Sequence, residues 1–324
     1  MIYPWHEAAW RALSAQAPPS ALLFYGKRAT GKRTFARAYA RLLLCEQAHN
    51  GHACGVCASC RLSEHGSHPD FYLLEPDEGS DNGTGRKLAH IKIDAVRALL
   101  EPLNQSSMRG GRRVVLIDPA ESLNPQAANA LLKILEEPPP AVVFLLVSGQ
   151  RGLLLPTVRS RCRPMPLPAP TPEQALAYLH AQGRGDGAAE QLAFHGGAPL
   201  FAAEPEQEAL RESLLVVLAE PRLLAVLNFA AEFDRHKYPL ALLLDWLYKW
   251  LADMALAQYG AAPQYYPARA ADSARAAAQT NPATLFRFQA DLNRLAPYGH
   301  HSLNVKMQAE ALLCHYLLLR QKRG

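Results

Sequence analysis

The segment from residue 21 to residue 44 constrains the fold more than any other part of the chain. Ala21-Leu22-Leu23-Phe24-Tyr25 has the composition of a buried strand, residues 26–34 form a basic loop bounded by glycines, and residues 34–44 have the pattern of a helix. A strand, a Gly-x4-Gly-Lys loop and a helix in this order are the context of a phosphate-binding loop. Its backbone N–H groups and the helix dipole favour an anion, to which Lys32 adds a point charge.

This loop departs from a working nucleotide site at one position. The residue after the lysine should be Ser or Thr, whose hydroxyl binds Mg²⁺, but it is Arg33, which has no oxygen to offer. Thr34 follows one residue later and would point elsewhere on the helix. We therefore expect Gly26, Gly31, Lys32 and Thr34 to form a degenerate nucleotide site. Binding of ATP with Mg²⁺ and a vestigial loop that only caps the helix remain the two alternatives.

A second nucleotide-site element is expected at the end of an inner strand. Val114-Val115-Leu116-Ile117 is followed by Asp118, which in an active site would hold the metal through water. An ATPase of this type normally has a Glu next, to polarise the attacking water. Here the residue is Pro119, and Glu121 lies two positions further along. Because loss of a positioned base costs roughly 10²-fold to 10⁴-fold in rate, we predict no intrinsic turnover.

Residues 1–165 alternate short apolar runs with helix-like stretches, which is typical of parallel strands joined by helical crossovers. Asp94 is predicted to cap a helix that reaches about Leu100, and Asn124 to cap one that ends at the triple proline 138–140. Ser148, after the last strand, would either touch a γ-phosphate or cap the sheet. Strands are expected at residues 71–74, 114–117 and 142–147, and a polar, glycine-rich loop at residues 77–87.

Four of the six cysteines lie close together in the chain, in the order Cys45-x8-Cys54-x2-Cys57-x2-Cys60. This spacing can place four thiolates tetrahedrally around Zn²⁺, and with no position left for water the metal would be structural. Free or redox-active thiols are the alternative. The clustering argues against a disulfide scaffold and for a reducing compartment. The nearby histidines are predicted to be surface residues, since four thiolates already fill the shell: His49, His52, His65 and His68.

Prolines at every second position or so between residues 163 and 172 indicate a domain boundary. Thr171-Pro172-Glu173-Gln174 has the form of a capping box that opens a small helical unit closing at Gly196-Gly197. Leucine- and alanine-rich helices dominate beyond about residue 204. We therefore expect an α/β domain at residues 1–166 with the cysteine insert, a small helical domain at 167–205 and an all-α domain at 206–324. The last would either pack against neighbouring subunits or form a self-contained bundle.

Composition excludes several classes of protein. An apolar fraction of 49% supports packed cores, and no apolar run approaches the roughly 18 residues needed to span a bilayer. The first residues lack the basic and apolar regions of a signal peptide, so we expect a soluble, cytosolic chain without a membrane partner. The net charge of +5 permits a nucleic-acid or nucleotide partner without requiring one.

The segment Thr157-Val158-Arg159-Ser160-Arg161-Cys162 ends the first predicted domain with two arginines. An arginine at a domain edge can reach a neighbouring subunit's nucleotide and stabilise charge in the transition state, an effect worth roughly 10³-fold to 10⁵-fold in rate. A solvated, basic helix end is the other interpretation of the same residues.

Taken together, these motifs resemble the delta-prime subunits of bacterial DNA polymerase III clamp loaders, within the AAA+ class. The resemblance covers the first two predicted domains and extends only loosely into the last third. Besides the loop, the cysteines and Ser160-Arg161-Cys162, the residues that carry it are Leu23-Phe24-Tyr25-Gly26, His68-Pro69-Asp70-Phe71, Val114-Val115-Leu116-Ile117-Asp118-Pro119-Ala120 and Asn129-Ala130-Leu131-Leu132-Lys133-Ile134-Leu135-Glu136-Glu137-Pro138-Pro139.

The resemblance implies an AAA+ module, a small helical lid and a helical collar through which five subunits form a ring with gamma or tau ATPase subunits and delta. It implies a zinc site and a subunit that does not hydrolyse ATP. Such a subunit helps load the sliding clamp onto primed DNA within the polymerase holoenzyme and offers Arg161 to an adjacent ATPase. Active relatives carry a nucleotide-sensing arginine in the lid, but Gly197-Ala198-Pro199-Leu200 has none.

Two other functions stay open on the sequence. One is a working ATPase close to the clamp loader's motor subunit, against which Arg33 and Pro119 argue. The other is a zinc-dependent adaptor that binds nucleic acid, with Arg109, Arg112 and Arg113 as its basic footprint. Those three arginines are more simply a solvated turn before a strand.

Overall fold

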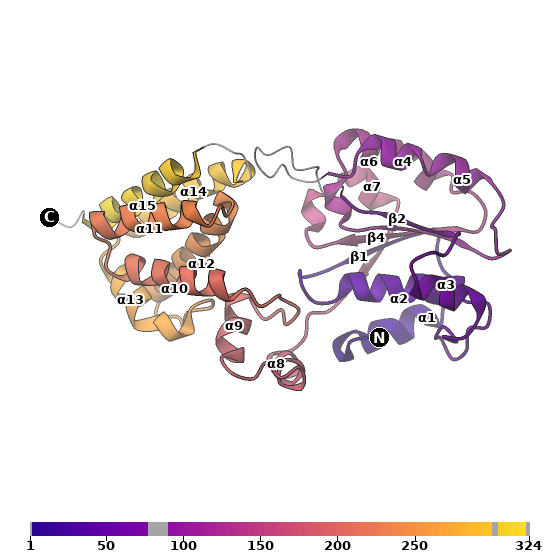
Figure 1. The fold of residues 1–324 in the computed structure, drawn as a ribbon, viewed down its shortest axis with the longest axis horizontal. Coiled ribbons are helices and arrows are strands. Elements are labelled where there is room, and N and C mark those ends of the chain that lie inside the picture. The colour runs from indigo at the N-terminus through magenta and orange to yellow at the C-terminus, as the bar shows by residue number, and fades with distance from the viewer. Residues whose placement is uncertain (1, 77–89, 300–303, 322–324) are drawn as a thin grey trace. The chain divides into compact units, whose positions relative to one another are not determined.

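The computed structural model describes the chain except for residues 1, 77–89, 300–303 and 322–324 (Figure 1). The predicted loop at residues 77–87 lies outside the described residues. The chain divides into two compact units, of which the first holds residues 1–78, 89–177 and 198–200 and the second holds most of the remainder. The three-domain division expected from the sequence places its boundaries differently and is taken up below as a proposal.

A five-stranded parallel sheet organises the first unit. Its strands are β1 (Ala21–Tyr25), β2 (Phe71–Leu74), β3 (Arg113–Ile117), β4 (Val142–Ser148) and β5 (Arg163–Pro166), in the order β2-β3-β4-β1-β5. The predicted strands and the α/β class are confirmed. Strand β5 was not predicted, because its prolines suggested only a boundary. It lies at the edge of the sheet beside β1, where a missing N–H is tolerated.

Helices cover both faces of this sheet (Figure 1). Residues of β1 alternate between two apolar cores: Leu22 and Phe24 pack into one and Leu23 into the other, and all three are inaccessible to solvent. Because helices cover both faces of the sheet, consecutive residues of its inner strands are apolar. One face carries α1 (Glu7–Ser14), α2 (Lys32–Leu44) and α3 (Ala58–Glu64), and the other carries α4 (Ile93–Arg97), α5 (Leu100–Asn104), α6 (Pro125–Glu136) and α7 (Pro156–Ser160).

The predicted helix starts agree with the structure at α6 and differ at α4. Asn124 Oδ1 accepts a hydrogen bond of 2.7 Å from Ala127 N, as an N-cap should. The prediction for Asp94 was wrong: Lys92 is the N-cap of α4, and the helix breaks after Arg97. The cause is long-range, because Ile91 pairs with the chain around Leu123 and thereby sets where the helix begins.

Helix α8 (Pro172–Ala181) begins in the first unit and ends in the second. Its predicted capping box is present, since Thr171 N donates to Gln174 Oε1 at 3.0 Å and Gln174 N donates to Thr171 Oγ1 at 3.3 Å. Helix α9 (Ala188–Phe194) ends before Gly196 and Gly197, whose φ angles of 64° and 87° suit a helix terminus.

Every regular element in the described part of the second unit is a helix. Trp246 and Trp250 of helix α12 (Leu240–Gln258) are buried in the core of this unit, and Trp250 Nε1 donates to the Tyr316 hydroxyl at 2.9 Å. Buried Asp253 accepts the N–H groups of Gln264, Tyr265 and Tyr266. The helices are α10 (Pro205–Ala219), α11 (Leu223–Arg235), α12 (Leu240–Gln258), α13 (Ala270–Ala278), α14 (Pro282–Leu295) and α15 (Val305–Gln321). In the part of the chain that the structure describes, none of the helices is both long and apolar enough to cross a bilayer.

Candidate functional site: a degenerate phosphate loop and a four-cysteine centre

The loop between β1 and α2 has a fixed backbone. Gly31 has a φ of 93°, which a residue with a side chain rarely adopts, and it places the first turn of α2 behind the loop. Three hydrogen bonds tie the loop down: Thr30 Oγ1 donates to Lys27 O and Trp5 Nε1 to Thr30 O, both at 2.8 Å, and Leu200 N donates to Ala29 O at 3.2 Å. The loop is therefore a rigid element of the first unit.

Lys32 lies inside this loop. Its side chain is buried, and Nζ donates to the carbonyl oxygen of Lys27. Burial lowers the pKa of the Lys32 ammonium, while the carboxylates of Glu121 and Asp118 act in the opposite direction. The predicted site residues Gly26, Gly31 and Lys32 thus belong to one loop, with Asp118 near enough to influence the lysine.

Arg33 binds the two carboxylates at the carboxyl ends of β2 and β3. Its Nε lies 3.3 Å from Asp118 Oδ2, and its NH2 group pairs with Glu75. Burial raises the pKa of Asp118, whereas Arg33 and Arg37 act to lower it. The guanidinium of Arg33 therefore neutralises the carboxylate that a metal ion would neutralise in an active site.

The residues at this site do not fit Mg²⁺. Mg²⁺ needs oxygen ligands in near-ideal octahedral geometry, but residue 33 offers a cation and Asp118 is already paired with it. Thr34, a predicted site residue, lines a groove along α2 together with Arg37 and Arg41. We therefore assign no step to a metal ion at this loop.

Glu121, the acidic residue two positions after Pro119, also has interactions within the chain. Glu121 Oε1 accepts the N–H of Gly149 at 3.0 Å and lies 3.8 Å from Arg28 NH2. Ser148 is fully buried, and its Oγ accepts the N–H of Gln150 at 3.2 Å, which caps the end of β4. These contacts engage Glu121 Oε1 and Ser148 Oγ, whereas the buried Glu121 Oε2 has no hydrogen-bond partner among the described residues.

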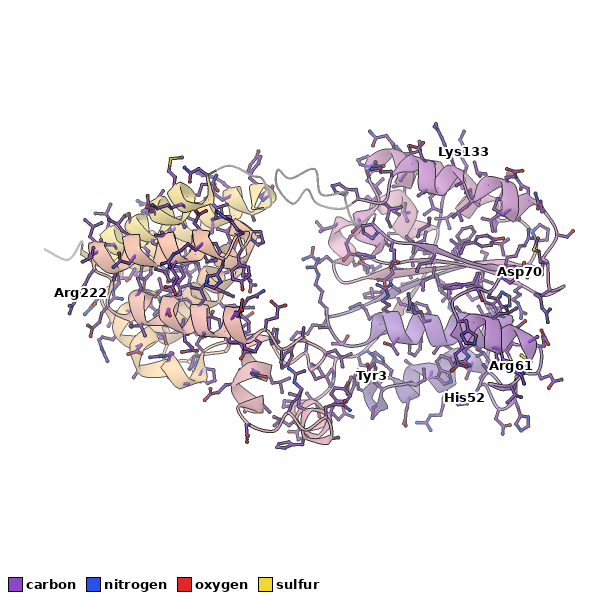
Figure 2. All side chains as sticks on the ribbon, viewed as in Figure 1. Tyr3, His52, Arg61, Asp70, Lys133 and Arg222 are labelled. Carbon is purple, nitrogen blue, oxygen red and sulfur yellow. The ribbon has the colours of Figure 1, made fainter. Side chains whose placement is uncertain are left out.

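Aromatic residues at the start of the chain cover the loop between β1 and α2. This contact was not predicted from the sequence. A Cβ atom at Gly31 would lie 2.4 Å from the ring of Tyr3, and Tyr3 stacks on Trp5 with ring centroids 4.8 Å apart (Figure 2). Leu200, from the segment in which no arginine was found, approaches the same glycine. The signal in the sequence was Tyr3-Pro4-Trp5-His6, an aromatic cluster directly ahead of an amphipathic helix.

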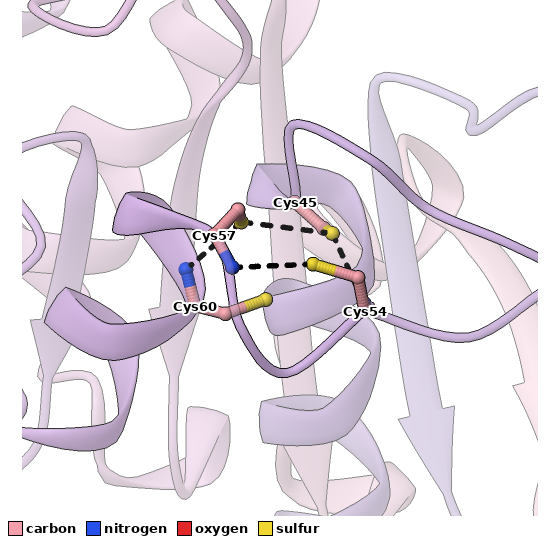
Figure 3. A group of neighbouring side chains, drawn as sticks. All are labelled: Cys45, Cys54, Cys57 and Cys60. Atoms are coloured by element: carbon pink, nitrogen blue, oxygen red, sulfur yellow. Dashed lines mark hydrogen bonds between the residues drawn. The ribbon is translucent and has the colours of Figure 1, made fainter.

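The four clustered cysteines converge as predicted (Figure 3). Their sulfur atoms all lie within 4.8 Å of one another, and Cys45 Sγ is 3.9 Å from Cys57 Sγ. Thiolates 2.3 Å from a zinc ion at the centre of a tetrahedron would be about 3.8 Å apart. Cys45 caps the end of α2, Cys57 begins α3, Cys60 follows in its first turn, and Cys54 lies in the loop between them. The group can hold a metal ion.

Backbone amides point at these sulfur atoms. Cys54 N donates to Cys45 Sγ at 3.2 Å, and Cys57 N donates to Cys54 Sγ at 3.3 Å. Hydrogen bonds from the backbone of Val56 and Cys57 lower the pKa of the Cys54 thiol to about 6. Amides of this kind stabilise the thiolate, which is the form that binds metal.

Glu46 connects the cysteine centre to the rest of the first unit. It accepts hydrogen bonds from Ser59 N at 3.2 Å and Ser59 Oγ at 2.8 Å, and Arg109 NH2 pairs with it at 2.6 Å. The hydrogen bond from Arg109 is the main cause that lowers the pKa of Glu46. Helix α3 is thereby fastened at its first turn, next to Cys60.

Comparison with known proteins identifies the family. The family model described as "DNA polymerase III, delta subunit" matches residues 6–171. The DNA polymerase III subunit delta' of Pseudomonas aeruginosa is 39% identical over 257 residues, which cover 77% of this chain and 76% of that protein. This chain belongs to the delta-prime family of DNA polymerase III. The Yersinia pestis subunit delta' is 36% identical over 269 residues, 76% of each chain. An Escherichia coli DNA polymerase III subunit tau is 39% identical over 142 residues, which cover 44% of this chain and 20% of tau.

Two predictions about polar residues of this delta-prime chain were wrong. His49, His52 and His65 are exposed as expected, but His68 is buried, and its Nδ1 accepts the N–H of Asp70 at 3.1 Å. Arg113 is not part of a solvated turn. Its buried guanidinium donates to backbone carbonyl oxygens of residues 103, 105 and 140, because residue 113 begins β3 and faces the ends of neighbouring segments.

Asp70 gives the segment His68-Pro69-Asp70 a structural role in this chain. Its buried carboxylate accepts hydrogen bonds from Ser107 Oγ at 3.1 Å, Met108 N at 2.9 Å and Arg109 N at 3.0 Å (Figure 2). This fixes the turn that presents Arg109 to Glu46 and so to the cysteine centre. Sequence spacing does not reveal this contact, since Asp70 and its partners lie far apart along the chain.

Arg161 in this delta-prime chain follows directly after α7. Its NH1 group donates to Thr157 O at 3.0 Å, and its NH2 group pairs with Glu136 at the end of α6. The side chain is 33% exposed. Two helix ends therefore hold this guanidinium at the surface of the first unit.

Proposed function

We propose that this chain is the non-hydrolysing structural subunit of a DNA polymerase III clamp loader. It would act with gamma or tau ATPase subunits and a delta subunit, in a ring of five, to load the sliding clamp onto primed DNA. Membership of the delta-prime family supports this role. The ion pair between Arg33 and Asp118 carries the non-hydrolysing part of the proposal, because it replaces the metal ion that phosphoryl transfer requires.

Arg161 is proposed to act on the nucleotide of a neighbouring ATPase subunit. Glu136 and the carbonyl oxygen of Thr157 orient the guanidinium, and a third of the side chain remains accessible. An arginine presented in this way can stabilise charge that develops on a phosphoryl group across an interface.

The cysteine centre is proposed to bind one Zn²⁺. With Cys45, Cys54, Cys57 and Cys60 as ligands the shell is closed, so the ion would supply folding energy rather than chemistry. It would join the end of α2 to the start of α3 and keep the segment between them in place.

The domain boundaries remain those proposed from the sequence: an AAA+ domain at residues 1–166, a lid at 167–205 and a collar at 206–324. Several large apolar side chains of the last region are exposed, including Leu223 at 56% and Leu224 at 71% on α11. Exposed apolar groups of this size favour contact with other subunits over a self-contained bundle.

The alternative functions have less support. A motor ATPase would need a metal ligand at position 33 and a base near position 119. A nucleic-acid adaptor loses much of its basic footprint, because Arg109 pairs with Glu46 and Arg113 is buried. DNA contact would then come through the assembled complex.

Reconstitution tests the proposal. The chain would be combined with gamma or tau and delta subunits from a related bacterium, and clamp loading on primed DNA would be measured with and without it. We expect loading to require the chain, while the chain alone hydrolyses no ATP. Loading that is equally fast without the chain, or steady ATP turnover by the isolated chain, would contradict the assignment.

A further inference from the structure

A groove of about 1380 Å³ runs along the outer side of α2 in the first unit. Residues of α1, the cysteine segment, the end of α3 and strand β2 line it, and His52 marks its position in Figure 2. Small-molecule pockets usually measure about 300 to 1,000 Å³. The size and the contribution of several elements indicate a site for part of a larger molecule.

Arginines dominate the charge of the groove. Arg33, Arg37 and Arg41 recur at every fourth residue of α2, about 6 Å apart along its axis, and Arg11 of α1 joins them. Arg33 is engaged by Asp118, and Arg41 lies 3.6 Å from Glu64. Within the described parts of the chain, no carboxylate forms an ion pair with Arg11 or Arg37. Two cations are thus available to a ligand.

Two buried N–H groups at the groove also lack an acceptor among the described residues. Trp10 is only 4% exposed, yet its indole Nε1 has no hydrogen-bond partner, and the same holds for Nε of Arg41. Both residues line the groove. Both atoms are inaccessible to solvent, so an acceptor oxygen in the groove would not reach them. The donors that a ligand in the groove would meet are the exposed guanidinium groups of Arg11 and Arg37.

The groove residues other than the arginines distinguish between two kinds of anionic ligand, single-stranded nucleic acid and an acidic peptide. Ile2, Leu44, Phe71 and Leu73 give the groove an apolar wall, and Glu7 and Glu64 contribute negative charge. Single-stranded nucleic acid carries a charge on every nucleotide and is usually held on open aromatic faces. Trp10 offers no such face, because it is buried and stacked against His52. A chain with carboxylates spaced between apolar side chains matches the lining better.

We propose that this groove is a docking site for an acidic segment of a partner protein, in which carboxylates alternate with apolar residues. The carboxylates would pair with the exposed side chains of Arg37 and Arg11, while apolar side chains would contact Leu44 and Phe71. Bidentate pairing of guanidinium with carboxylate supplies both affinity and orientation. The proposal does not rest on the proposed function, although the groove shares Arg33 and Thr34 with the degenerate nucleotide loop.

A binding experiment on the full-length, metal-replete chain tests the site. The probe is a fluorescein-labelled dodecapeptide of alternating Asp and Leu, followed by fluorescence anisotropy. Arg37→Ala and Arg11→Ala should each weaken binding by about tenfold, as expected for loss of a hydrogen-bonded charge pair. Arg97→Ala is the matched control, since Arg97 lies on α4, on the other face of the sheet, and its side chain is 64% exposed. It should bind like the unmodified chain.

A second variant and a second probe complete the test. Trp10→Phe keeps a ring at the groove and removes an N–H that a ligand cannot reach, so we expect peptide binding, circular dichroism and metal content to stay unchanged. A labelled twelve-nucleotide oligothymidylate should bind more weakly than the peptide. The proposal is overturned if the peptide does not bind, if Arg37→Ala and Arg97→Ala behave alike, or if the oligothymidylate binds more tightly and loses affinity in Arg37→Ala.

Discussion

Nε of Arg33 lies 3.3 Å from Oδ2 of Asp118, so a residue of the phosphate loop neutralises the carboxylate at the end of β3. The arginine removes a metal-ligating hydroxyl and also supplies a permanent positive charge in its place. A loop with this charge does not need Mg²⁺ to balance Asp118, and a divalent cation there would meet a guanidinium at close range. In this loop the ion pair between Arg33 and Asp118 therefore takes the place that a metal ion has in an active phosphate loop.

Replacing Arg33 should make nucleotide binding depend on metal. In Arg33→Thr the hydroxyl of a normal loop returns and Asp118 is released, so a fluorescent ATP analogue should bind more tightly with Mg²⁺ than with EDTA. Arg33→Lys keeps the charge without the hydroxyl and is the matched control. Titrations of the unmodified chain, Arg33→Thr and Arg33→Lys with the analogue measure its affinity. We expect Mg²⁺ to leave the affinity of the unmodified chain and of Arg33→Lys unchanged. Hydrolysis should stay absent in Arg33→Thr because Pro119 still provides no base. A clear gain from Mg²⁺ in the unmodified chain would show that Arg33 does not displace the metal.

The cysteine centre should retain one zinc ion per chain through purification without chelators. Cys54→Ser should lower the zinc content well below one, because a closed site loses affinity with any ligand, and it should loosen residues 45–60. Cys314→Ser is the control, since Cys314 is a cysteine of α15 outside the cluster. Elemental analysis and limited proteolysis measure both effects. Less than about half a zinc ion per unmodified chain, or equal zinc loss in the two variants, would rule out this centre as the site.

His6 should make stability depend on pH. Burial lowers the pKa of His6 to about 4, against 6.5 in an unfolded chain. The unfolded state therefore takes up the proton first as pH falls, and stability is lost between about pH 6.5 and pH 4 by up to about 3 kcal/mol. His6→Phe, which suits the edge-on contact with Phe35, should show a smaller fall in melting temperature between pH 7 and pH 5. His65→Phe, at an exposed position, should match the unmodified chain. An equal fall in all three proteins would mean that His6 is not the group responsible.

The sequence predicts most of the sheet because the strands and helix starts are determined by residues that are close together in the chain. Continuous apolar runs such as Val142–Val147 mark strands buried on both faces, and Asn124 with Pro125 marks a helix start through contacts within its first turn. The cysteine centre could be predicted for the same reason, since all four candidate ligands come from the short segment between Cys45 and Cys60. The errors concern residues whose environment depends on distant partners.

His68 and Arg113 illustrate those errors. His68 is buried beside Asp70, which binds the turn at residues 107–109. Arg113 is buried where its guanidinium donates to the carbonyl oxygen of Pro140, which lies in another crossover. Neither partner can be found by spacing. Arg33 is an intermediate case: its chemistry was evident from the sequence, but its partners Glu75 and Asp118 become apparent only when the ends of β2 and β3 are placed side by side.

Arg161→Ala should disable the assembled complex without disturbing the chain itself. The residue is partly exposed and bound at helix ends, so its truncation should change the stability of the fold by only about 0.5 kcal/mol. Assembly with partner subunits should survive. The ATPase activity stimulated by DNA and clamp should fall, because one interfacial site loses the cation that meets charge on the transferred phosphoryl group. Steady-state ATPase and clamp-loading assays on the reconstituted complex measure this.

Arg159→Ala and Arg161→Lys make the test of Arg161 specific. Arg159 lies two residues earlier on α7, so its removal makes the same change of charge and should leave the activity of the complex intact. Arg161→Lys should rescue poorly, because an ammonium group cannot reproduce the bidentate guanidinium geometry. If the Arg161→Ala complex hydrolyses ATP and loads clamps at the unmodified rate, the role across the interface is wrong. The contacts with Glu136 and Thr157 then make Arg161 an ordinary basic helix end.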